Sequence, residues 1–262
     1  MKKEYNLHRF LLLAFGIPLI CCSFRVSCTF FQEGVGNLIL LMIAATSPML
    51  AAILTIALSS EFHIKTFLNK NYKENLSLKY SLMVFLIPAF FLTIGKIIIC
   101  LATPQYAAFK MPTLKKMVII LWALVAEELG WRGYLQGALE RRIGNSLAPC
   151  IVGVIWTLWH YHFWIIDGLD APLWLFAYGC IAESYGYALI TKLSRENIVP
   201  ASIWHFSSNL FFNMYLINPN WNGGSIIPYL IVNGVYTFYI LVFFIHKHIN
   251  KHAGYKRQKY NL

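Results

Sequence analysis

Several apolar stretches, each long enough to cross a bilayer, constrain this chain more than any other feature of its sequence. A membrane-spanning helix needs roughly 20 apolar residues. Charged residues make up only 13% of the 262 residues, about half of their usual share in a soluble protein. We therefore expect an all-α, polytopic membrane protein, a bundle of about eight transmembrane helices. The expected spans lie at about 10–30, 37–59, 80–102, 116–139, 147–166, 171–191, 198–217 and 226–246.

The segments between the expected spans are short. No hydrophilic stretch is long enough to form a soluble domain, so we expect a single transmembrane domain over residues 1–262. The first apolar run is followed by further spans and by no small-residue cleavage site. We therefore expect it to be a retained helix rather than a cleaved signal peptide.

Positive charge gathers on one side of the expected bundle. The net charge is +11, and lysine and arginine are concentrated in the cytoplasmic loops of membrane proteins. If the amino terminus is inside, most basic residues fall in inner segments. These are Lys2, Lys3, Arg9, Lys65, Lys70, Lys73, Lys79, Arg141, Arg142, Lys192, Arg195, Lys247, Lys251, Lys256, Arg257 and Lys259. We therefore expect a multi-pass protein of the cell membrane with both termini cytoplasmic.

The same basic residues suggest which partners to expect. Short basic loops meet anionic lipid at the membrane surface, so membrane lipid is an expected partner. The basic residues form no stripe with interleaved aromatic side chains of the kind that binds nucleic acid, and we expect no nucleic-acid partner.

The fourth expected span carries three charged residues near its middle, Glu127, Glu128 and Arg132. A charge near the bilayer centre costs ~2.5–3.5 kcal/mol on insertion scales, so such residues are rarely without a role. Glu128 and Arg132 are four residues apart, share a helix face and can pair. Glu127 points about 100° away on a helix of 3.6 residues per turn. The spacing predicts that the arginine holds one acid while the other projects elsewhere.

Polar residues also interrupt three later spans. Trp156 and His160 are four residues apart, as are His205 and Asn209, and Glu183 lies between these pairs. Each has an ordinary structural explanation, because ion pairs and polar side chains also join helices inside membranes. Two acids, two histidines and an amide at similar depth exceed what packing requires and favour a functional site. The role of Glu183 stays undecided.

The chemistry that suits this set of residues is hydrolysis. A carboxylate in an apolar site can act as a general base near neutral pH. A histidine can share the activation of water or bind a metal, and a histidine and an asparagine on one helix face can donate to an oxyanion. No serine or cysteine has the partners of a nucleophile, and no His-Glu-x-x-His motif is present.

Three motifs, in this order and spacing, resemble those of the CPBP family of intramembrane proteases. The family includes type II CAAX prenyl proteases and bacteriocin-processing enzymes, which are also called Abi proteins. The motifs are Glu127-Glu128-x-x-x-Arg132, Trp156-x-x-x-His160 and His205-x-x-x-Asn209. Tryptophan stands where the second motif commonly has phenylalanine, a change expected to touch packing rather than chemistry. The resemblance covers a family-like catalytic core at about 117–213, with Glu128 and Arg132 as supporting residues.

What the resemblance implies is an intramembrane endopeptidase whose site lies in a cavity between transmembrane helices. Glu127 would be the water-activating carboxylate, assisted by His160. His205 and Asn209 would stabilise the oxyanion. The substrate would be a membrane-associated peptide or protein, cut at a peptide bond in or near the membrane.

Metal dependence is an open part of this interpretation. The family is usually described as metalloproteases, so zinc is a candidate cofactor, with Glu127, His160 and His205 as candidate ligands. A metal-free mechanism driven by glutamate has also been argued for the prenyl proteases. Asn209 is a poor zinc ligand and shares a helix face with His205, which suits an oxyanion pair better. On this ligand set we favour metal-free activation of water.

Two functions of other classes stay open. The first is a non-catalytic membrane scaffold or bacteriocin-immunity protein that keeps the same fold. The second is a proton-coupled transporter with Glu127, Glu128 and Glu183 as its relay. Against the transporter, the sequence shows no inverted repeat. Cleavage of membrane peptides by the solubilised protein would separate both from a protease.

Overall fold

The computed structural model describes residues 5–59 and 63–260, and the regular structure of that part is entirely helical. Of the basic residues discussed above, Lys2 and Lys3 lie outside the described residues. In chain order the helices are α1 (Leu7–Ser27), α2 (Gly34–Ala57), α3 (Ile64–Tyr72), α4 (Leu78–Ala102), α5 (Leu114–Ala126), a π-helical segment (Leu129–Gln136), α6 (Gly137–Ile143), α7 (Ala148–Trp159), α8 (Tyr161–Ile166), α9 (Leu173–Leu193), α10 (Val199–Met214) and α11 (Ile227–Tyr260). The all-α fold expected from the sequence is confirmed.

Within the described residues, five helices are long and apolar enough to cross a membrane. They are α1, α2, α4, the pair α7–α8 read as one helix, and α11 up to Asn250. The other three expected spans, 116–139, 171–191 and 198–217, are helical but carry most of the polar residues of the motifs. Because these side chains lower hydropathy, and because α10 has only 16 residues, these three crossings stay predictions.

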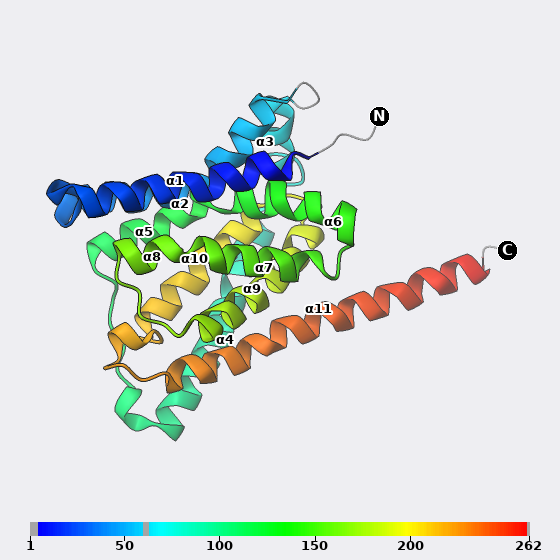
Figure 1. Ribbon diagram of the computed structural model, residues 1–262. Coiled ribbons are helices and arrows are strands. Elements are labelled where there is room, and N and C mark those ends of the chain that lie inside the picture. Colours follow the sequence, from blue (N-terminus) through cyan, green and yellow to red (C-terminus); the bar gives the residue numbers. More distant parts are fainter. Residues whose placement is uncertain (1–4, 60–62, 261–262) are drawn as a thin grey trace.

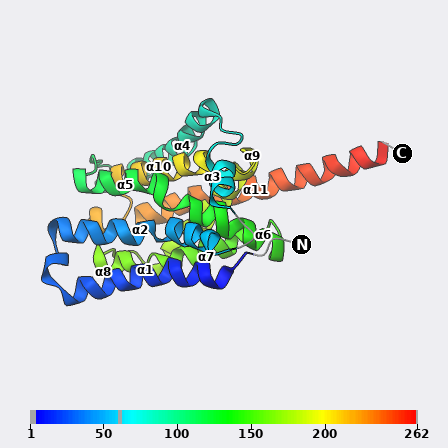
Figure 2. The same cartoon turned by 90° about the horizontal axis from the view of Figure 1, so that it is seen from above.

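The helices pack as a bundle around the segments that carry the motifs (Figures 1 and 2). α1 packs on α2, α2 on α5, α5 on α10 and α10 on α4, while α9 lies between α7 and α11. The start of α1, α6 and the end of α11 lie at one end of the bundle, and α8 lies at the other. Segments predicted to face the cytoplasm therefore gather at one end.

The helix expected over 116–139 is not a regular α-helix. α5 ends at Ala126, Glu127 is its C-cap, and the eight residues Leu129–Gln136 form a π-helix before α6 begins. π-helical turns are rare and occur frequently at functional sites. The change in winding falls next to the two adjacent acids, so the directions of their side chains do not follow from the α-helical 100° step alone.

Gly130 allows the π-helical segment to lie directly against α2. A Cβ atom at this position would collide with the backbone of Pro48. α2 packs on the π-helical segment, and Ala51 and Ala52, which follow Pro48 along α2, are small and fully buried. This close approach of two helices places the neighbouring acids inside the bundle rather than at its surface.

Candidate active site

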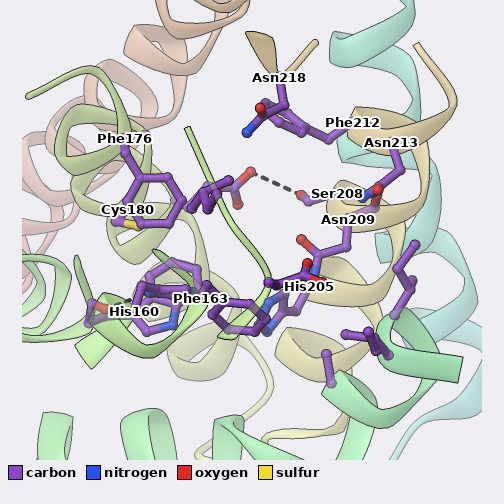
Figure 3. Close-up of a pocket in the computed structure, with 18 of the residues that line it drawn as sticks. His160, Phe163, Phe176, Cys180, His205, Ser208, Asn209, Phe212, Asn213 and Asn218 are labelled. Atoms are coloured by element: carbon purple, nitrogen blue, oxygen red, sulfur yellow. Dashed lines mark hydrogen bonds between the residues drawn. The ribbon is translucent and has the colours of Figure 1, made fainter. Parts of the chain in front are cut away.

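A cavity of about 240 Å³ lies among α5, α7, α9 and α10, and it contains the residues singled out by the sequence (Figure 3). Glu127, His160, His205 and Asn209 all line it, and so does Glu183. Much of the remaining wall is apolar, including side chains from α5, α8 and the start of α9. Motifs separated by whole helices along the chain therefore meet at one cavity.

Glu127 is held by two indole groups. Trp156 donates from Nε1 to the Oε2 atom of Glu127 at 2.9 Å, and Trp131 donates to the same oxygen at 3.4 Å. The glutamate is only 4% exposed. The bond from Trp156 overturns the expectation that tryptophan in the second motif affects packing alone, because phenylalanine has no such donor.

Glu128 lies behind the cavity wall and joins the first motif to the third. Its Oε2 atom lies 3.3 Å from Nε of Arg132, in an ion pair whose side chains are both fully buried. Its Oε1 atom accepts a hydrogen bond from Nδ1 of His205 at 2.9 Å. The pair with Arg132 is the one that the i, i+4 spacing predicts, whereas the sequence did not indicate the bond to His205.

Arg132 is enclosed by aromatic rings. Its Cζ atom lies 4.5 Å from the ring centre of Tyr187 and 5.3 Å from that of Trp156, and Nη2 donates to Oγ of Ser184 at 3.3 Å. Rings at these distances favour a buried cation. Neither Arg132 nor Glu128 lines the cavity, so their place in the structure suits a supporting role rather than contact with a substrate.

His160 stands where α7 gives way to α8. Its Nδ1 atom lies 2.6 Å from the backbone carbonyl oxygen of Trp156. A carbonyl can only accept, so Nδ1 carries the proton and the neutral ring keeps a lone pair on Nε2. Figure 3 shows His160 across the cavity from Asn209. Nε2 of His160 can therefore accept a hydrogen bond from a water molecule in the cavity.

His205 and Asn209 project from one face of α10 into the cavity, as their spacing predicts (Figure 3). Because Nδ1 of His205 donates to a carboxylate, its Nε2 is the ring nitrogen left for a ligand. The side-chain amide of Asn209 makes no hydrogen bond to any residue that the structure describes; its backbone carbonyl accepts one from Asn213.

Several residues of the site escaped the reasoning from sequence. Trp131, Tyr187 and Ser184 surround the two acids and the arginine. Nothing in the sequence separates these aromatic and small polar residues from the many that pack helices or face lipid. The sequence indicates Glu183 as an intramembrane acid, and the structure adds that it lines the cavity.

The arrangement of possible metal ligands does not match a catalytic zinc site, which needs three protein ligands. Among the residues that the structure describes, no three His, Cys, Asp or Glu side chains come together as a metal-binding group. Nδ1 of His160 is bonded to a backbone carbonyl and Nδ1 of His205 to Glu128, which leaves Nε2 of each ring as the atom that could bind a metal. The zinc ligands implied by the resemblance, Glu127, His160 and His205, do not converge as arranged.

The groups around the cavity are those that hydrolysis requires. A carboxylate and a histidine with a free lone pair can activate water, and a histidine–asparagine pair can donate to a negatively charged oxygen. The fold is that of a helical membrane protein, and its buried cavity gathers the types of side chain that hydrolysis uses.

Comparison with known proteins agrees with this class. Residues 109–211, which contain all three motifs, match the family model described as type II CAAX prenyl endopeptidase Rce1-like. The CAAX prenyl protease 2 of Methanococcus maripaludis is 26% identical over 237 residues, covering 79% of this chain and 84% of that protein. Both matches support the resemblance to the CPBP family that the three motifs indicate.

Proposed function

We propose that this protein is an intramembrane endopeptidase of the CAAX protease type, which hydrolyses a peptide bond in or near the membrane. The observation that carries the proposal is the meeting of Glu127, His160, His205 and Asn209 around one cavity. The similarity to a CAAX prenyl protease supports it. The substrate is a membrane-associated peptide or protein.

Water activation falls to Glu127 and His160. Both indole donors contact Oε2 of Glu127, so Oε1 takes a proton from the attacking water. The free Nε2 of His160 accepts a hydrogen bond from the second hydrogen of that water. This bond turns a lone pair of the water oxygen toward the carbonyl carbon. When the C–N bond breaks, the proton held by Glu127 passes to the departing amine.

His205 and Asn209 stabilise the oxyanion that forms on the carbonyl oxygen. The amide of Asn209 donates one hydrogen bond. For His205 to donate from Nε2 as well, its ring must carry both protons, because Nδ1 already donates to Glu128. Glu128 then supplies the negative counter-charge of the imidazolium.

A cleavage assay tests the proposed function. The detergent-solubilised protein is incubated with a library of membrane-associated peptides, and the products are located by mass spectrometry. We expect cleavage at defined peptide bonds by the wild-type protein. If folded protein cuts no member of a broad library, the result favours the non-catalytic scaffold.

We also expect both termini to be cytoplasmic, and the two ends of α9 offer a matched test. Asp170 and Lys192 are both exposed, one near each end of this helix. In a background without the native cysteines, Asp170→Cys should react with a membrane-impermeant maleimide added to intact cells. Lys192→Cys should react only after permeabilisation. The reverse pattern would place both termini outside.

Zinc should not be required for activity. The purified, active protein should contain well under one zinc per chain and should stay active after prolonged treatment with a strong chelator. The reason is that three zinc ligands do not converge among the described residues. Stoichiometric zinc, with chelator-sensitive activity that added metal restores, would contradict this and would make His160 and His205 ligands.

A further inference from the structure

Glu183 is a buried acid in the cavity wall that the proposed mechanism does not use. It lies on α9, is 5% exposed and lines the cavity. Its Oε1 atom accepts a hydrogen bond from Oγ of Ser208 at 2.9 Å (the dashed line that ends at Ser208 in Figure 3). Its Oε2 atom accepts from Nε1 of Trp204 at 2.8 Å. Both carboxylate oxygens therefore bind the same neighbouring helix, α10.

The two donors are placed one helical turn apart, and each directly precedes a residue of the proposed oxyanion pair. Trp204 precedes His205, and Ser208 precedes Asn209. Successive residues of an α-helix point about 100° apart. Holding Trp204 and Ser208 against α9 therefore fixes the rotation of α10. This rotation turns the residues that follow them, His205 and Asn209, toward the cavity.

Asn209 depends on this rotation more than His205 does. His205 has a partner of its own, since Nδ1 donates to Glu128. The Asn209 side chain makes no hydrogen bond to any described residue, and it is the backbone of this residue that binds Asn213. The direction of the Asn209 side chain is therefore set by the placement of α10. Glu183 anchors α10 in the same helical turn, through Ser208.

We propose that Glu183 is a positioning residue: through Trp204 and Ser208 it sets the rotation of α10 that aims His205 and Asn209 at the substrate oxygen. This role rests on the proposed protease function. It requires hydrogen bonding by Glu183 rather than its charge. If Glu183 instead bound a cationic side chain of the substrate, its negative charge would be required.

Two substitutions separate hydrogen bonding from charge. Glu183→Ala removes both bonds to α10 and should lower kcat by about 10- to 100-fold with little change in KM, because misplaced groups lose transition-state contacts. Glu183→Gln should stay within a few-fold of wild type. Its amide oxygen can accept from Trp204, and its amide nitrogen can donate to the hydroxyl of Ser208.

Asn233→Ala provides a matched control. Nδ2 of Asn233, on α11, donates to the backbone oxygen of Leu175 on α9 at 2.8 Å, in a buried bond that does not involve α10. Its loss should lower thermal stability and leave kcat unchanged. Ser208→Ala removes one of the two bonds to Glu183 and should give a smaller kcat loss, which keeps the test available if Glu183→Ala fails to accumulate.

Hydrogen–deuterium exchange over residues 199–214 gives a readout that needs no substrate. Exchange should rise in Glu183→Ala and stay at the wild-type level in Glu183→Gln. If this pattern holds while wild-type protein cleaves no peptide, the positioning of α10 stands and the protease function fails.

Three outcomes would overturn the role of Glu183. The first is full kcat and unchanged exchange in Glu183→Ala. The second is a kcat loss in Glu183→Gln as large as that in Glu183→Ala, which would show that the charge is needed. The third is a raised KM with unchanged kcat in both variants, which would assign Glu183 to a cationic part of the substrate.

Discussion

Replacing Glu127 by glutamine should lower kcat/KM by at least about 100-fold, because the variant loses its general base. The protein should still insert and accumulate. Glutamine has nearly the same size, and its amide oxygen can accept the hydrogen bonds that Trp156 and Trp131 donate to the glutamate. What it cannot do is take a proton from water. Cleavage kinetics on protein matched for folded fraction by size-exclusion chromatography measure the effect.

Glu140→Gln is the matched control for this substitution. Glu140 lies on α6, does not line the cavity and accepts a hydrogen bond from Nε2 of Gln136. Its neutralisation should leave cleavage unchanged. Substantial residual cleavage by Glu127→Gln would assign the base to another residue. Glu128 would be the next candidate, although its burial and its bonds to Arg132 and His205 turn it away from the cavity.

The general architecture was predictable because it is encoded in long apolar runs of the sequence. The bilayer requires backbone hydrogen bonds to be satisfied within each segment, which leaves helices for runs of this length. Local spacing likewise predicted the ion pair of Glu128 with Arg132 and the common face of His205 and Asn209. Each of these features depends on residues no more than four positions apart.

The remaining features depend on packing between distant segments or on winding that no residue pattern encodes. The π-helical turn after Glu128 changes the hydrogen-bond register without a proline or another sequence signal to mark it. The bond between Glu128 and His205 joins residues 77 positions apart. The indole of Trp156 donates to Glu127 only because α7 lies beside α5 at that depth. Site roles assigned through the motifs stay predictions until they are tested.

Removing either partner of the buried ion pair between Glu128 and Arg132 should destabilise the folded state. Removing one partner leaves a poorly compensated buried charge, at a cost of about 3–5 kcal/mol. Glu128→Gln and Arg132→Met should therefore each lower folded yield and the thermal unfolding temperature. The double substitution, which removes both charges, should recover part of the loss. Purely additive losses would show that the two residues are not coupled.

An ion pair near the end of the bundle provides the comparison. Lys116 and Asp167 approach to 2.9 Å, but both side chains are partly exposed. Exposed pairs contribute about 0–1 kcal/mol. Asp167→Asn should therefore lower stability far less than either substitution in the buried pair. A loss as large as that of Glu128→Gln would mean that burial is not what makes the inner pair costly to break.

Cleavage activity should distinguish Glu128→Gln from Arg132→Met, although both substitutions lower stability. The double variant regains folded yield because no uncompensated charge remains, but it has also lost the carboxylate that holds Nδ1 of His205. Arg132→Met keeps that carboxylate, so the fraction that folds should retain more cleavage per molecule than Glu128→Gln. In the double variant, restored folding should come without restored kcat. Equal kcat for folded Arg132→Met and folded Glu128→Gln would show that the bond from Glu128 does not orient His205 for the reaction.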